Sequence, residues 1–152
     1  MLGVFFRSPN IEVEIEKARI LDFYVVFPFL LSEFRFPPGR QKWVKHARTL
    51  ENKYETVPDP KRLFLQMAGI QIATLRNLAE KEMIDPERLS AGYVASKRER
   101  WSAGVSELMP HWESVDPLSL DCITQELFLL PLYGRDGLKA RSGLMEFRYD
   151  AV

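Results

Sequence analysis

The side chains that most often bind metals or act as catalytic nucleophiles and bases are scarce in this chain. It has two histidines, His46 and His111, and one cysteine, Cys122. These three residues do not have the spacing of metal ligands. Cys122 falls in the apolar pattern of a predicted helix, which indicates a buried structural thiol. His46 lies in a basic stretch, where a surface position is favoured over a role as a catalytic base.

The familiar catalytic motifs are also absent from the sequence. It contains no GxxxxGK[ST] phosphate loop, no GxGxxG fingerprint after a predicted strand and no GxSxG nucleophile elbow. The carboxylates are distributed along predicted helix faces, and no pair of them is singled out as an acid and a base. The sequence therefore predicts a binding protein rather than an enzyme, with no catalytic residues, no cofactor and no metal.

The first candidate binding surface is the strongly basic segment 40–53. In this segment Arg40, Lys42 and Lys45 surround Trp43. The simpler interpretation is the solvated face of an amphipathic surface helix. The functional interpretation is a contact for nucleic acid or for an acidic protein surface.

The second candidate surface is the segment 133–152, in which glycines space a basic loop. Lys139 and Arg141 lie in this loop. An ordinary hairpin is one interpretation; the other is a mobile loop that brings two cations to an anion or a partner. A strand with period-two alternation is predicted to follow, and it carries Arg148 and Tyr149. Together with the four residues of segment 40–53, these are the candidate partner-binding residues.

The remaining elements must position these residues, and the segment 20–36 is expected to be the central helix. From 20 to 31 it is apolar except for Asp22 and Pro28. A surface helix has a narrower apolar stripe, so this helix should be buried, and it is too short to span a membrane. Pro28 should make it kink or restart. Asp22 is either turned toward water or a nearby arginine, or is a buried acid that docks a basic group.

Asp-Pro pairs punctuate the middle of the chain. An aspartate followed by proline is typical of a helix N-cap and its first position. Asp59, Asp85 and Asp116 each precede a proline, so helices should begin after them. The first should be a long helical segment, 61–83, which is either continuous or two helices broken near Gly69. Its apolar face consists of Leu63, Phe64, Met67, Ile70, Ile72, Leu75, Leu78 and Ala79.

The predicted fold is mainly α with a small β element, in one compact helical domain over 1–152. Segment 1–16 is a lead-in that becomes helical near Glu14, although its alternation also suits a short edge strand. Further helices are predicted from 97 to 108 and from 118 to 130. The order of long helix, short helix and extended segment over 75–94 is winged-helix-like, but many helical hairpins share it.

The overall charge restricts the classes of function. The formal net charge is zero, which argues against a stand-alone nucleic-acid binder, because such proteins gain affinity by neutralising phosphates. A neutral subunit inside a complex fits better. The N-terminus lacks the plan of a signal peptide, so a cytoplasmic location without membrane contact is expected.

Three stretches in order resemble the middle-component proteins of three-component ABC-ATPase antiphage systems of the Lamassu type. They are ILDFY at 20–24, continuing through FP at 27–28; PDPKRLF at 58–64 with IQ at 70–71; and DGLKAR at 136–141 with GLMEFRYD at 143–150. Together they span most of the chain.

The resemblance implies a small non-enzymatic subunit that acts beside an SMC-like coiled-coil ATPase and an effector nuclease. Such a subunit would bridge the two and help to restrain the effector until foreign DNA is sensed, and any DNA contact would come through the complex. The alternative is a stand-alone winged-helix DNA-binding regulator. A regulator should have a basic second short helix, and the segment 87–90 is poor in cations.

Overall fold

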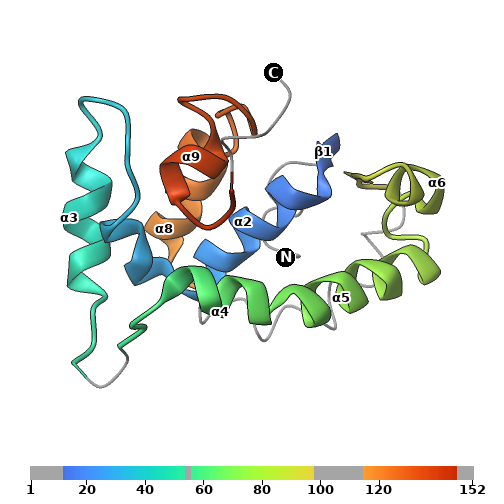
Figure 1. Cartoon of the computed structure of the whole chain (residues 1–152), viewed down its shortest axis with the longest axis horizontal. Coiled ribbons are helices and arrows are strands. Elements are labelled where there is room, and N and C mark those ends of the chain that lie inside the picture. The colour runs from blue at the N-terminus through green and yellow to red at the C-terminus, as the bar shows by residue number, and fades with distance from the viewer. Residues whose placement is uncertain (1–11, 54–55, 98–114, 147–152) are drawn as a thin grey trace.

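The structure, a computed structural model, describes residues 12–53, 56–97 and 115–146 (Figure 1). The predicted helix 97–108 and most of the predicted strand at 145–150 lie outside these residues. The described elements are β1 (Glu12–Glu14), α2 (Ile15–Val26), η1 (Pro28–Ser32), α3 (Gln41–Thr49), α4 (Pro60–Gln66), α5 (Ala68–Glu80), α6 (Pro86–Ser90), β2 (Tyr93–Ala95), α8 (Pro117–Cys122), the π-helical turn η4 (Ile123–Leu127) and α9 (Leu138–Ser142).

Helix α2 runs through the middle of the molecule, with α3, α8 and α9 toward one end and α6 with β2 at the other (Figure 1). Its Ile20, Leu21 and Phe23 are completely buried. The Phe23 ring packs edge-on against Phe64 of α4, with centroids 5.7 Å apart. The α-helix stops at Phe27, and a 3₁₀ turn restarts at Pro28, which confirms the predicted break, because proline removes a backbone donor.

The three predicted Asp-Pro helix starts are all present. Asp59 accepts from the backbone N of Arg62 at 2.9 Å, and Asp85 from that of Glu87 at 2.9 Å. Asp116 accepts from the backbone N of Ser119 at 2.7 Å. Each side chain satisfies an N–H group that a helix N-terminus leaves without a partner. These local signals therefore fix where α4, α6 and α8 begin.

The β element is a two-stranded antiparallel sheet of β1 and β2. Glu12 pairs with Ala95 and Glu14 with Tyr93. The short edge strand considered for segment 11–16 is thus present, and the helix begins immediately after it, at Ile15. The mainly α fold with a small β element is confirmed. The described residues include the helix–helix–strand order α5–α6–β2, while a wing after β2 would fall in 98–114.

Asp22 is a buried acid, 6% exposed. Gln71 of α5 donates to its Oδ2 at 2.9 Å, and Arg19 donates to the side-chain oxygen of Gln71 at 3.0 Å. An amide inside the core is thus one partner of this acid, and the polar cluster joins α2 to α5. Within the part of the chain that the structure describes, no helix is long and apolar enough to cross a membrane.

Candidate partner-binding surfaces

Helix α3 is amphipathic, and its inner face is fixed to the helical turns of 117–127. Trp43 and Ala47 are buried. The Trp43 Nε1 donates to Glu126 Oε1 at 3.3 Å, and Arg40 Nε donates to the other oxygen of Glu126 at 2.7 Å. One carboxylate thus holds two of the candidate residues. Trp43 has a structural position rather than an exposed one, while Arg40 remains partly open to solvent.

His46 forms a second tie between α3 and α8. Its Nε2 lies 2.7 Å from Asp116 Oδ2, and both side chains are about three-quarters buried. Partial burial raises the pKa of the Asp116 carboxyl, but hydrogen bonds from His46 and Ser119 outweigh it and hold that pKa below its ordinary value. His46 is therefore mostly buried in a contact between two helices, not on the open surface that the sequence favoured.

Cys122 lies at the end of α8 and is buried, as predicted. Burial, and after it the charge of Glu126, raises the pKa of this thiol to about 12. A thiol with such a pKa holds almost no thiolate at neutral pH, and thiolate is the reactive form. The residue behaves as a small core side chain.

The outer face of α3 consists of Lys42, Lys45 and Arg48, which are all exposed. The Lys42 Nζ lies 4.1 Å from the centre of the Trp43 ring, a cation–π distance. No ion pair of these three cations occurs among residues 12–53, 56–97 and 115–146. This face keeps the open positive charge that the sequence predicted, and a partner role for it remains a prediction.

The glycine-spaced segment, in contrast, is not a mobile loop. Residues Leu138–Ser142 form helix α9. A Cβ atom at Gly137 would lie 2.2 Å from the carbonyl oxygen of Tyr133, and Gly143 ends the helix with a positive φ of 68°. Both glycines are thus required by tight local backbone geometry. The prediction of a mobile basic loop was wrong, because these glycines fold a compact turn and helix.

Lys139 is buried within this turn and helix. Its side chain is only 5% exposed, and its Nζ lies 2.8 Å from Glu16 Oε2 of α2. The same Nζ lies 4.7 Å from the centre of the Tyr133 ring. A charge is buried only where other groups compensate it, and here α2 and Tyr133 do so. The expectation that this charge is openly available is therefore contradicted.

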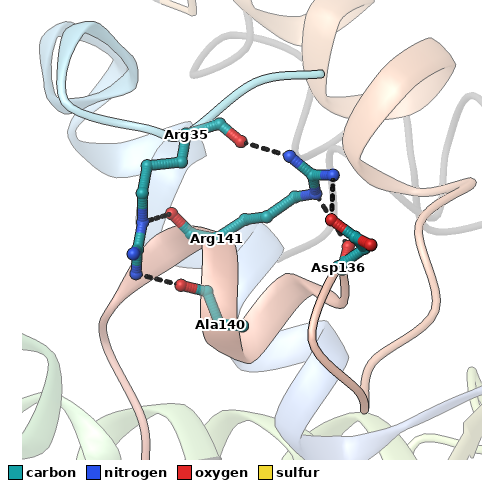
Figure 2. A network of polar contacts seen from close by, with 4 residues as sticks. All are labelled: Arg35, Asp136, Ala140 and Arg141. Carbon is teal, nitrogen blue, oxygen red and sulfur yellow. Dashed lines mark hydrogen bonds and ion pairs between the residues drawn. The ribbon is translucent and has the colours of Figure 1, made fainter. Parts of the chain in front are cut away.

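Arg141 is engaged in a network that joins α9 to the chain after η1 (Figure 2). Its Nη1 donates to the carbonyl of Arg35 at 2.8 Å, while Nε and Nη2 donate to the carbonyl and carboxylate of Asp136, each at 2.7 Å. In return, the Arg35 guanidinium donates to the carbonyls of Ala140 and Arg141. These carbonyls lie at the end of α9, where helices leave acceptors without partners. Two arginines thus fasten the tail by exchanging backbone hydrogen bonds.

Arg148 and Tyr149 lie outside the described residues. On α6, the short helix of the winged-helix alternative, Arg88 is ion-paired with Glu12 and stacked over the Tyr93 ring at 4.9 Å. In the described segments no group of His, Cys, Asp and Glu could hold a metal.

One exposed apolar surface was missed by sequence reasoning. Ile70 was assigned to the buried face of the long helix, but it is 68% exposed, and Leu65 is 58% exposed. The helix has a break at Met67, close to the predicted position, and the buried face there contains Phe64, Gln71 and Leu75 instead. The sequence contains no signal for this, because the partners that allow Gln71 to be buried lie on α2.

A comparison with known families identifies the class of protein. The chain matches, over residues 1–150, the family model described as ABC-three component (ABC-3C) system Middle Component 5. It therefore belongs to this family of middle components. No curated protein and no solved structure matches the chain significantly. As a middle component, the protein works with the other components of an ABC-3C system, which suggests an adaptor-like role.

Proposed function

We propose that this protein is a non-catalytic interaction subunit of a Lamassu-type antiphage defence complex in the cytoplasm. It bridges an SMC-like coiled-coil ATPase and an effector nuclease, and it helps to restrain the effector until foreign DNA is sensed. The observation that carries the proposal is the family match over residues 1–150. The match concerns a system of three components, and a middle component that bridges must contact two others.

The described surface supports a bridging role because two unlike faces lie on different helices. One is the basic outer face of α3, and the other is the exposed apolar surface with Leu65 and Ile70 on α4 and α5. The outer face of α3 is basic, with Lys42, Lys45 and Arg48 exposed at one end of the molecule (Figure 1). Such a patch suits an acidic protein surface, and charge complementarity mainly sets encounter rate and specificity. Lys139 and Arg141, which are held inside the fold, are better assigned to keeping that fold together.

The test is assembly of the three purified components with a charge-reversed α3. Lys42→Glu combined with Lys45→Glu should weaken binding to one component and leave the other contact intact, because the two contacts use different faces. The matched control is Lys53→Glu, an exposed lysine just beyond the helix. A parent protein that binds neither the ATPase nor the effector would overturn the proposal. Loss of restraint would appear as cleavage of a reporter nucleic acid without the foreign DNA that activates the complex.

A stand-alone DNA-binding regulator has less support. The only cation of α6 is Arg88, and its guanidinium is paired with Glu12. A recognition helix needs cations or amides that are open to phosphates and bases. Tight binding of the isolated protein to duplex DNA at physiological salt would favour this alternative instead.

A further inference from the structure

Helices α4 and α5 present a continuous outer face along one edge of the molecule (Figure 1). The backbone keeps a helical path through the break, since Met67 has φ −71° and ψ −13° and accepts from the backbone N of Gln71 at 3.0 Å. Residues follow each other at about 100° around such a helix. Gly69 and Ala73 therefore form a line of small residues, with Leu65 on one side and Ile70 on the other. We call this the α4–α5 face; its exposed residues are Lys61, Arg62, Leu65, Gln66, Gly69, Ile70, Ala73, Arg76, Asn77 and Glu80.

The glycine on this face has no explanation inside the described chain. A Cβ atom at Gly69 would meet no heavy atom within 4 Å, and the residue does not have a positive φ. Glycine is among the least favourable residues in a helix interior. A residue that is unfavourable for the helix, and that the surrounding chain does not require, is expected where a second backbone must approach closely.

Charge limits what can approach. Arg62 and Arg76 lie near the midline of this face but toward its two ends. Along the helix axis they are about four turns, or roughly 21 Å, apart. Within the described segments, neither they nor Lys61 forms an ion pair. Glu80, one turn beyond Arg76, is the single acid among the exposed residues of this face. Two copies of the face packed together would place these cations opposite one another in either direction, so a second copy is disfavoured.

We infer that the α4–α5 face docks an amphipathic α-helix of the ATPase component. The inference rests on the proposed function and names the partner of one of its two contacts. The docked helix would lay an apolar ridge along Gly69 and Ala73, between Leu65 and Ile70. Acidic residues about four turns apart on that helix would meet Arg62 and Arg76. A long helix fits a nearly straight face that has cations toward both ends, because it can contact the whole length of that face.

The test measures binding of the full chain to the purified ATPase component. Leu65→Glu should weaken binding by about tenfold or more, because it places an acid in the apolar contact. Gly69→Leu should do the same by blocking close approach. It should not lower the melting temperature of the isolated protein, because the site is open and leucine favours a helix. The matched control is Leu129→Glu, at a leucine 76% exposed on a different surface, which should bind within about twofold of the parent.

A photocrosslinker placed at Gln66 identifies the occupant. Crosslinks to a helical segment of the ATPase with the expected acid spacing would support the inference. Parent-like binding by Leu65→Glu and Gly69→Leu, or crosslinks to the effector or to another copy of this chain, would overturn it while leaving the proposed function standing. If the parent binds neither component, the proposed function and this inference fail together. Should Leu65→Glu fail to fold, Gly69→Leu still decides between these results.

Discussion

Helices α3 and α9 are both short and basic, and the amino-acid sequence makes them equally good candidates for partner contact. In the structure, Lys45 of α3 points to solvent, whereas the Lys139 side chain of α9 is 5% exposed. The difference lies in what faces each helix. Glu16 and the Tyr133 ring lie against Lys139, and Asp136 with the Arg35 carbonyl lies against Arg141. A run of cations marks a binding surface only where the fold leaves the charges without internal acceptors.

Charge reversal in α9 should give the largest effect. Lys139→Glu places two carboxylates together at a buried position, and losing one partner of a buried ion pair destabilises a protein by about 3–5 kcal/mol. Because Glu16 is partly exposed, we expect the free energy of unfolding to fall by about 3 kcal/mol. Chemical denaturation measures it. Lys139→Met, which keeps the apolar stem without the charge, should lose less; a variant as stable as the parent would mean that α9 is an exposed element after all.

The stability that the inner face of α3 gains from Asp116 should decrease in acid. The pKa of Asp116 is depressed when the protein is folded, so its contribution to stability is complete above its ordinary value of 3.8. That contribution is lost as the pH falls through the lower, folded pKa. Asp116→Asn retains a capping oxygen but removes this dependence, and it should lower stability at neutral pH by about 1 kcal/mol.

Melting temperatures between pH 2.5 and 6 make this measurement. The Asp116→Asn curve should be flatter than that of the parent over the acid range. His46→Gln should flatten it in the same way, since it removes a group that lowers the pKa of Asp116. Identical slopes in all three proteins would show that the contact between α3 and α8 contributes nothing to acid sensitivity.

The outer face of α3 should give the smallest effect on stability. Lys45→Glu changes an exposed side chain and should alter the free energy of unfolding by less than about 0.5 kcal/mol. The thiol of Cys122 provides a sensitive check, because it is buried on α8, which packs against α3. Burial raises the pKa of this thiol to about 12, so it should react slowly with alkylating reagents. Fast labelling in Lys45→Glu, but not in the parent, would show that this residue holds α3 in place.

The parts of the fold that were predictable from sequence depend on contacts between close neighbours in the chain. Asp59, Asp85 and Asp116 act on N–H groups two or three residues away, so their roles can be read from neighbouring letters. The break at Pro28 is equally local. For the same reason, the starts of α4, α6 and α8 agree with the prediction, whereas α5 ends at Glu80 rather than at 83 and η4 ends at Leu127 rather than at 130.

The candidate site was less predictable because its contacts are distant in sequence. The Arg35–Arg141 exchange joins residues 106 positions apart, and periodicity contains no information on which arginine meets which carbonyl. Gly137 was taken as a sign of mobility, although its role depends on the close approach of Tyr133. Ile70 was misplaced because the core side of α5 accepts Gln71, which finds Asp22 and Arg19 on α2.

The exchange between Arg35 and Arg141 has a consequence for biosynthesis. During translation α2 and α3 leave the ribosome long before α9 is made, and until then Glu16 lacks its ion pair with Lys139. Contacts between such distant segments form late, because a long loop must close first. A nascent chain should therefore acquire protease resistance in a final step, only after residues 136–142 have emerged. Ribosomes stalled before and after this segment would reveal that step as a change in digestion pattern.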